Sequence, residues 1–334
     1  MDSASRLDSS PPSLALPLEL SAVLGPDKDR YFASGYRSVR YEVNAIRAAN
    51  DGESISADCA VRYPADWSRR TDGTVRVPHL STIDAVILPL LVTERLSPSI
   101  RDSPTASRVA AFSLRAGAEP WDRLDRVPVT YSATPDPAAG TLRLDGTVGN
   151  IKSSVTLANW PADAHEPELT TTAARTRREN RSISRSVYGD LTLATRTSTW
   201  LTDYDPEARV LRCEHRAETE PAAAAAGSHG LESAYWPGVT AIDQLTLMGQ
   251  LAQAIIYIAN GIDRARMGTL WMRNSALEFS LDPLPLPGDW TSTTTIVRDR
   301  RIRGAESVHD LLVQSRTSSG VTAKASLAYS ESAE

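Results

Sequence analysis

The sequence predicts an α+β protein made of two tandem repeats, each an antiparallel sheet wrapped around one long helix. Two similar stretches are the first reason: residues 77–88 read VPHLSTIDAVIL and residues 236–247 read WPGVTAIDQLTL. In each, Ile-Asp follows a proline by five and six positions, and the two aspartates, Asp84 and Asp243, are 159 residues apart. Solenoid repeats recur every 20–50 residues or so, so this period indicates two related domains fused in one chain.

The order of elements is the second reason, beginning with the first half. Residues 36–63 alternate in hydrophobicity as a hairpin does, with a turn at 50–52. A helical segment follows Asp84, and Pro89 inside it predicts a kink or a short helix. A run of strands is expected next, at residues 108–115, 127–131, 140–147 and 153–157.

The second half repeats this order. Its strand pair is predicted at residues 186–200 and 209–218, with the turn at 203–206. The helix predicted over residues 240–260 is apolar on nearly every face, which is typical of a buried helix, and Gly261 is expected to cap it. Strands are then expected at residues 269–279, 291–301, 308–314 and 321–329.

Two such units can lay their sheets edge to edge, which removes exposed strand edges and buries both helices. This arrangement resembles a double hotdog fold. The sequence therefore predicts four segments: a disordered tail at residues 1–20, a first repeat at 21–165, a basic linker at 166–185 and a second repeat at 186–330. The arginines of residues 175–185 suit an acidic partner such as an acyl carrier protein, although a solvated linker is the simpler interpretation.

The composition limits the classes of function. The formal net charge is -5 and the sequence pI is about 5.7, which argues against general nucleic-acid binding. The sequence shows no basic leader with an apolar core and no long apolar run, so a cytoplasmic protein without membrane attachment is expected. Cys59 and Cys213 occupy similar points in the two halves and are expected to be buried free thiols rather than metal ligands.

Residues 229–243 contain the candidate chemistry. His229 lies eight residues before Pro237, Gly238 follows, and Asp243 lies six residues after Pro237. This spacing resembles the signature of the β-hydroxyacyl thioester dehydratases of fatty-acid synthesis. A histidine can act as a general base, and a glycine N–H at a helix N-terminus can hold a thioester oxygen. A carboxyl group in an apolar pocket can stay protonated and act as an acid.

In that family the histidine and the glycine come from one subunit and the acid comes from its partner. The resemblance therefore implies an active site in which His229 and Gly238 face Asp84 across the two repeats. The residues assigned to substrate binding are Gly238, Pro237, Val239, Tyr235, Trp236 and His79.

A second, degenerate site is implied by the same pairing. It would combine Asp243 with Arg70 and His79, which occupy the base and glycine positions of the first half. Both aspartates also have a simpler explanation, because a hydroxyl residue stands three positions before each of them, as in a helix capping box. Capping and catalysis are compatible roles.

Two runs resemble the avirulence protein D (AvrD) family: residues 24–36 (LGPDKDRYFASGY) and 237–250 (PGVTAIDQLTLMGQ). The resemblance covers roughly residues 22–330. That family is associated with acyl-sugar elicitors called syringolides, made from a β-ketoacyl chain and a pentulose, and the A-factor (butyrolactone) synthases follow a related logic. The resemblance implies an acyltransferase or condensing enzyme that joins a β-ketoacyl thioester to a small hydroxy-ketone or pentulose.

On this interpretation His229 activates the acceptor hydroxyl, Gly238 holds the thioester oxygen, and Asp84 positions a reacting hydroxyl or donates a proton. No metal or redox cofactor is expected, because the substrate arrives on the phosphopantetheine of acyl carrier protein or coenzyme A. A homodimer is compatible with this hypothesis. Two other hypotheses stay open: a dehydratase or thioesterase acting on a polyketide or fatty-acyl intermediate, and a non-catalytic acyl-binding module.

Overall fold

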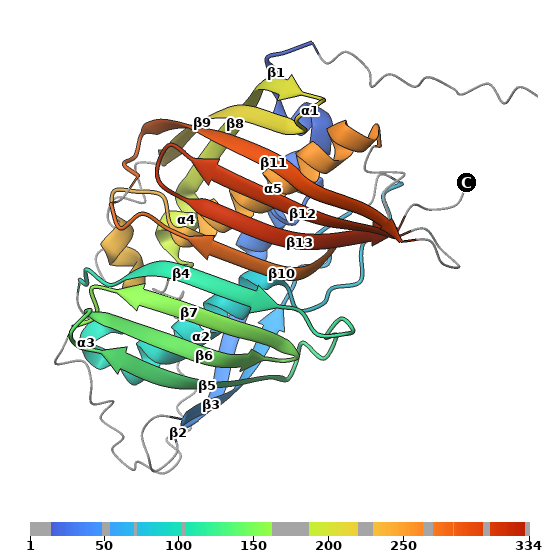
Figure 1. Cartoon of the computed structure of the whole chain (residues 1–334). Coiled ribbons are helices and arrows are strands. Elements are labelled where there is room, and N and C mark those ends of the chain that lie inside the picture. Colours follow the sequence, from blue (N-terminus) through green and yellow to red (C-terminus); the bar gives the residue numbers. More distant parts are fainter. Residues whose placement is uncertain are drawn as a thin grey trace, which may run out of the picture.

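The structure is a computed structural model that describes residues 15–48, 54–69, 72–101, 104–161, 187–219, 230–262, 270–282, 284–302 and 308–330. Within these ranges the strands form one antiparallel sheet of 13 strands (Figure 1). In spatial order they are β1 (Leu18–Glu19), β8 (Thr195–Asp205), β9 (Val210–Thr219), β11 (Gly288–Ile302), β12 (Val308–Thr317), β13 (Thr322–Ser330), β10 (Trp271–Glu278), β4 (Arg108–Arg115), β7 (Ile151–Ala158), β6 (Thr141–Val148), β5 (Val127–Asp136), β3 (Ser54–Arg62) and β2 (Arg40–Ala48).

The strand order is the same in the two halves of the sheet. From the outside inward, the first half runs β2-β3-β5-β6-β7-β4 and the second half runs β8-β9-β11-β12-β13-β10, with the short strand β1 added outside β8. The innermost strands β4 and β10 pair antiparallel, with Phe112 opposite Leu277, so neither half has an open inner edge. Cys59 on β3 and Cys213 on β9 lie on corresponding strands, and both are buried free thiols as expected.

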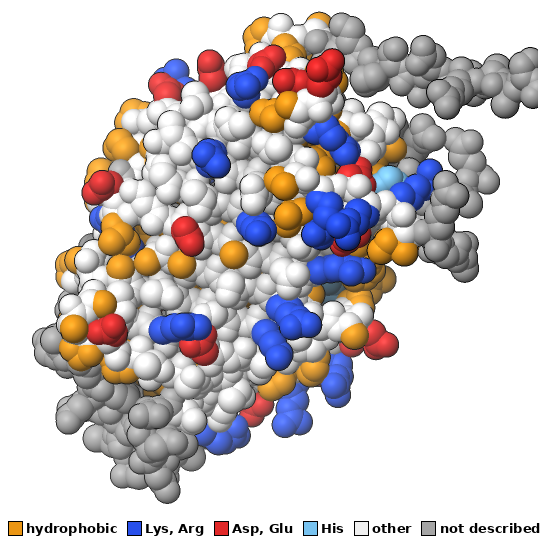
Figure 2. All heavy atoms as spheres, in the orientation of Figure 1, with side chains coloured by type: hydrophobic (Ala, Val, Ile, Leu, Met, Phe, Trp, Pro, Cys, Tyr) orange, Lys and Arg blue, Asp and Glu red, His pale blue; other side chains and the backbone are white. Residues whose placement is uncertain are grey.

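Two long helices, α2 (Thr82–Leu96) and α5 (Ala241–Asn260), lie on the same side of the sheet (Figure 1), and the opposite side is the face seen in Figure 2. The prediction for α5 is confirmed, because most of its residues are buried and Gly261 caps it in the left-handed conformation. The short helical segments are α1 (Leu20–Leu24), η1 (Asp27–Asp29), η2 (Gly35–Ser38), α3 (Pro98–Arg101), α4 (Asp190–Ala194) and η5 (Leu231–Tyr235).

The prediction that Pro89 shortens or kinks the first helix is wrong as to length, because α2 continues for 15 residues through Pro89. Proline has no N–H to donate to the carbonyl four residues earlier, which here is that of Ala85. The Ser153 hydroxyl on β7 donates to the Ala85 oxygen at 2.9 Å instead. A residue 68 positions away thus satisfies the backbone group that the proline leaves open.

The expected start of the second half also needs correction. Residues 190–194, predicted as part of a strand, form the helical turn α4, and β8 runs on to Asp205 before the turn. The buried carboxylate of Glu232 explains the helical turn, because it accepts the backbone N–H groups of Gly189 and Thr192, each at 3.0 Å. The basic linker lies outside the described residues, and the predicted domain boundaries stay predictions.

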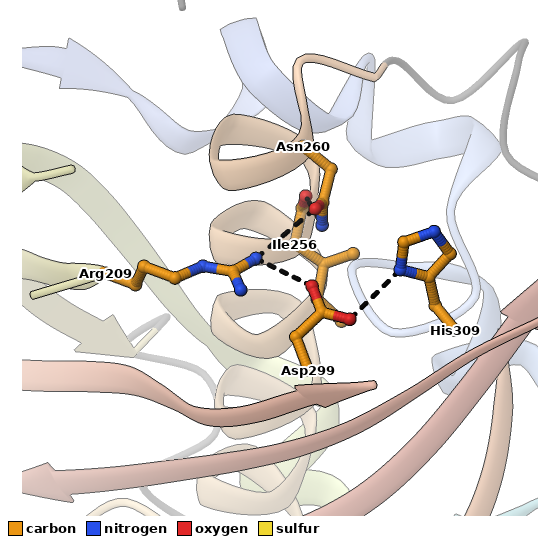
Figure 3. Close-up of polar contacts among 5 residues, drawn as sticks. All are labelled: Arg209, Ile256, Asn260, Asp299 and His309. Atoms are coloured by element: carbon orange, nitrogen blue, oxygen red, sulfur yellow. Dashed lines mark hydrogen bonds and ion pairs between the residues drawn. The ribbon is translucent and has the colours of Figure 1, made fainter. Parts of the chain in front are cut away.

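A polar cluster ties the C-terminal end of α5 to the sheet (Figure 3). The Asp299 carboxylate on β11 lies 3.0 Å from Arg209 Nη2 and 3.0 Å from His309 Nδ1 on β12. Arg209 also donates to the Asn260 side-chain oxygen at 3.3 Å, and Asn260 donates to the Ile256 carbonyl at 3.0 Å. The cluster joins the β8–β9 turn, the helix and two strands at one point.

Gly146 on β6 provides a test of the close approach between β5 and β6. A Cβ atom there would lie 1.9 Å from the Thr130 carbonyl oxygen and 2.5 Å from the Tyr131 Cα. We expect Gly146→Ala to lower the free energy of unfolding by about 1–3 kcal/mol, measured by urea denaturation. The control is Gly249→Ala in α5, where the nearest atoms are in the Phe32 ring at 3.5 Å, an ordinary contact. Because alanine favours helix by about 1 kcal/mol over glycine, the control is expected to hold or gain stability, and equal losses in both variants would contradict the prediction.

Candidate functional site

A cavity of about 1190 Å³ lies between helix α5 and the strands near the junction of the two halves. The side chains that line it along α5 are Leu245, Met248, Gly249, Ala252, Gln253 and Tyr257. The sheet contributes mainly apolar side chains to the opposite wall: Leu277, Val313, Ala325 and Leu327. A cavity with such walls suits an extended apolar chain.

Polar side chains line the cavity at the N-terminus of α2, and we call this place the polar end: Tyr31, His79, Ser81 and Thr82. The ring centroid of His79 lies 6.2 Å from that of Trp67 and 6.3 Å from that of Trp271. Ser81 caps α2 and Thr82 is its first residue, so the Thr82 backbone N–H has no partner within the helix. The N–H groups and the dipole of α2 favour an oxygen that carries negative charge at this place.

Asp84 lies behind the polar end and is fully buried. It forms the predicted capping box with Ser81, whose backbone N–H donates to Asp84 Oδ2 at 2.7 Å. The Tyr41 hydroxyl donates to Oδ1 at 2.7 Å, and the Tyr63 hydroxyl donates to Oδ2. Burial raises the pKa of Asp84, and the hydrogen bonds from Tyr63, Ser81 and Tyr41 act in the opposite direction.

Tyr31 connects the cavity with this buried carboxyl group. Its hydroxyl lies 2.7 Å from Ser81 Oγ and 3.4 Å from the Tyr63 hydroxyl, and Tyr63 in turn binds Asp84. Burial raises the pKa of Tyr31 well above its ordinary value, and the nearby charge of Asp84 raises it further. Tyr31 is therefore a protonated hydroxyl at neutral pH and can donate a hydrogen bond into the cavity.

Arg30 places a buried cation in the cavity wall, with only 6% of the residue exposed. Its guanidinium donates to Gln250 Oε1 on α5 at 2.6 Å and to the Asp27 carboxylate, while Nε has no hydrogen-bond partner. Burial lowers the pKa of Arg30, and Asp27 opposes this effect. Because an arginine stays charged, this group is suited to hold a carbonyl or enolate oxygen of a bound molecule.

The remaining charged residues that line the cavity are mostly basic: Arg76, Arg115, Arg273 and Lys324, against the single acid Glu119. Such a charge balance favours a ligand that carries negative charge.

The substrate-binding residues predicted in the second half lie elsewhere. Segment 237–239 pairs with segment 284–286: the Val239 N–H donates to the Leu284 carbonyl at 3.0 Å, and Gly238 is buried opposite Pro285. Tyr235 is buried, and its hydroxyl accepts from the Val109 N–H at 2.9 Å. Trp236 is half-buried and Pro237 is exposed.

None of these five residues, 235–239, lines the 1190 Å³ cavity, whereas His79 does. The Leu80 N–H donates to the Trp121 carbonyl at 2.8 Å, just as Val239 donates to Leu284, so His79 and Gly238 hold corresponding positions. His229 and Arg70 lie outside the described residues, and their proposed roles stay predictions. The cavity therefore contains His79, which the sequence assigned to the degenerate site, and neither Gly238 nor Asp84 of the implied active site.

Asp243 caps α5 in the second predicted capping box. Its Oδ2 accepts from the Thr240 N–H at 3.0 Å and from the Thr240 hydroxyl at 2.7 Å. Burial raises the pKa of Asp243 to about 6, against the influence of the nearby Arg37. Like Asp84, Asp243 does not line the cavity, so neither aspartate meets a ligand there directly.

The sequence reasoning missed Arg30, Tyr31, Gln253 and Trp271, which line the cavity. Arg30 and Tyr31 stand within the run 24–36 on which the family resemblance was based, and that run was the available signal. No comparable pattern marks Gln253 or Trp271.

The described part of the chain has neither a metal-binding cluster nor a membrane-spanning helix. It contains no group of three or more His, Cys, Asp or Glu side chains arranged to hold a metal ion. None of the helices described is long and apolar enough to span a bilayer.

Fold and cavity together define a class: a protein in which an antiparallel sheet covers two central helices and a largely apolar cavity ends at a helix N-terminus. Within that class the chain belongs to the AvrD family, because the family model described as Pseudomonas avirulence D protein (AvrD) matches residues 19–330. The family resemblance seen in the sequence is thus confirmed. A comparison with curated proteins finds no match.

Solved structures of hotdog proteins are similar at low sequence identity. A tesB protein of Mycobacterium avium subspecies paratuberculosis is 10% identical with a TM-score of 0.41, over 85% of this chain and 95% of its own. A hotdog-fold protein of Alicyclobacillus acidocaldarius is 10% identical with a TM-score of 0.37, over 87% of this chain and 97% of its own. The PpsC dehydratase domain of Mycobacterium tuberculosis, solved with C12:1-CoA, is 9% identical with a TM-score of 0.36, over 86% of this chain and 98% of its own. Similarity at this level does not identify an activity.

Glu232 provides a test of the electrostatics around α4 and α5. Burial raises its pKa from an ordinary 4.5 to about 8, against the effect of the backbone hydrogen bonds that it accepts. The folded protein therefore holds a proton that the unfolded chain releases, and this contribution to stability is lost as pH rises from about 4.5 to 8. Glu232→Gln keeps the acceptor oxygen and removes the titration, so we expect its stability relative to wild type to increase with pH. Urea denaturation at pH 5, 6.5 and 8 measures this, and a constant difference across that range would contradict it.

Proposed function

We propose that this protein is an enzyme of double-hotdog type that joins a β-ketoacyl thioester to a small hydroxy-ketone or pentulose. The observation that supports this most directly is that His79, Tyr31 and the N-terminus of α2 meet at one end of the apolar cavity. Membership of the AvrD family supports the same substrates. The identical strand order in the two halves supports the tandem fold.

In this proposal the acyl chain lies along α5 and the thioester carbonyl lies at the polar end. The Thr82 N–H and the α2 dipole stabilise the oxyanion that forms when a nucleophile attacks. Arg30, with its unpartnered Nε, holds the β-keto oxygen. Tyr31, hydrogen-bonded to Ser81, donates to one of the two oxygens.

His79 is the proposed general base. It takes the proton of the acceptor hydroxyl, whose oxygen forms a bond to the thioester carbon. The carbon–sulfur bond then breaks, and the thiolate leaves with the proton returned by the imidazolium. Asp84 acts behind this group by fixing the tyrosines and Ser81, as a positioning residue.

The test compares His79 with His229, the two candidates for the general base. Purified protein is incubated with a β-ketoacyl thioester, with and without a small ketose, and the products are followed by mass spectrometry. We expect His79→Ala to lose about 10²–10⁴ in rate, the usual contribution of a general base, while His229→Ala keeps most of it. A larger loss of rate in His229→Ala than in His79→Ala would assign the base to His229, as the sequence resemblance implied.

The products distinguish the reaction classes. An acyl-sugar mass that appears only with the ketose supports the proposal. Water loss or hydrolysis without the ketose would replace it by a dehydratase or thioesterase, and binding without turnover would leave an acyl-binding module.

A second test concerns the position of the acyl chain. Ala252 lines the cavity from α5, and Ala252→Phe adds a ring to the space assigned to the chain. We expect kcat/KM for thioesters with a ten-carbon chain to decrease at least tenfold, with little change for a four-carbon chain. The short substrate is the internal control for folding, and an equal loss for both lengths would contradict this placement.

A further inference from the structure

The outer face of the sheet, opposite the helices, has a groove over the junction of the two halves. Its volume is about 540 Å³, and β4, β6, β7, β10 and β13 line it. Figure 2 looks onto this face, where Lys and Arg side chains gather toward one side of the sheet. The floor consists of small residues: Ser113, Gly146, Ser154, Ala276 and Ser326.

The strand register brings three cations around this floor. Arg115 on β4 stands directly opposite Lys152 on β7. Lys324 lies on β13, two strands away from the strand of Arg115. With the usual strand spacing and rise per residue, the Cα atoms of Lys324 and Arg115 are about 12 Å apart. All three side chains are exposed. Two of the three lysines in the whole sequence are therefore in one groove.

Among the described residues, no ion-pair partner balances these cations. In the described ranges, the acid that lines the groove is Asp145, and Arg143 already binds it at 2.7 Å. None of Arg115, Lys152 and Lys324 forms an ion pair with a described residue. Like charges that face each other on neighbouring strands are destabilising, so the arrangement favours a bound anion. The serine hydroxyls of the floor can donate to its oxygens.

The groove and the cavity share part of their lining near the end of β4. Arg115, Asn274, Ser275 and Lys324 line both of them. Ser275 is 8% exposed, and its hydroxyl has no hydrogen-bond partner. A flexible arm can therefore run from the outer groove past these residues to the cavity, with Ser275 available to one of its polar groups.

We propose that the groove binds the phosphates of coenzyme A and that the pantetheine arm carries the thioester from there to the polar end. This inference rests on the proposed function, in which the cavity accepts an acyl thioester. Three separated cations match the diphosphate and the 3′-phosphate of coenzyme A. The prosthetic group of a carrier protein offers one phosphate, which leaves two of the cations without a partner.

The experiment measures binding of free coenzyme A by calorimetry, so it does not depend on turnover. The ligands are coenzyme A, dephospho-coenzyme A and pantetheine, and the proteins are wild type, Lys152→Ala/Lys324→Ala and Arg212→Ala. We expect the double variant to weaken coenzyme A binding at least tenfold and pantetheine binding less than twofold. Arg212→Ala, at an exposed arginine of β9 that pairs with Asp203 and does not line the groove, is the matched control and should change the dissociation constant for coenzyme A less than twofold. Binding of coenzyme A by wild type should also weaken as salt is raised.

Three results would overturn the inference: equal affinity of wild type for coenzyme A and pantetheine, unchanged affinity in the double variant, or an equal loss in Arg212→Ala. Binding of a carrier-protein thioester that needs Lys152 and Lys324, with no binding of coenzyme A, would also overturn it. Coenzyme A binding without any acyl transfer would keep the groove and reject the proposed function. If acyl transfer from acyl-pantetheine requires His79 but coenzyme A does not bind, the proposed function is kept and the groove is rejected as a coenzyme A site.

Discussion

The antiparallel pairing of β4 with β10 is the interaction on which the rest of this structure depends. It joins two six-strand arrangements of identical order into one sheet and leaves no open edge between them. Because both helices lie on the same side of that sheet, the pairing also sets the space between α5 and the junction strands. The cavity, its polar end and the outer groove all lie at this junction, so the candidate site is a product of the fusion of the two halves.

Helix ends provide the electrostatics of the molecule. At α2 and α5 a capping box satisfies backbone N–H groups with a buried aspartate, and burial raises the pKa of both carboxyl groups. The two ends nevertheless differ in what stands before the cap. His79 precedes the cap of α2 in a position open to the cavity, whereas Gly238 is buried against the 284–286 segment. The same local motif therefore presents a histidine side chain to the cavity at one end and a packed backbone at the other.

Charge is distributed in a way that fits a ligand with an apolar tail and an anionic head. The walls along α5 are mainly apolar, Arg30 places one cation inside, and Arg115 and Lys324 line the outer groove as well as the cavity. A buried guanidinium is costly unless it is bonded, and Gln250 and Asp27 provide part of that bonding. Arg30 Nε and the Ser275 hydroxyl have no hydrogen-bond partner, so these are the two places where a bound ligand would add a hydrogen bond.

Local sequence by itself determined the elements with the strongest signals. The buried helix α5, its glycine cap, both capping boxes and most strands follow from hydrophobic period, hydroxyl-to-acid spacing and turn residues, which act over a few positions. The resemblance of residues 24–36 and 237–250 to the AvrD family also predicted the family that the family model confirms.

Tertiary structure alone decided the rest, because contacts between distant residues override local preference. Ser153 allows α2 to pass through Pro89, and Glu232 imposes a helical turn on residues 190–194. The polar end combines Tyr31, His79 and the wall of α5, which are far apart in the chain. Only the packing of the two halves shows that the cavity ends at His79 rather than at Gly238, because the repeat motif is nearly the same in both.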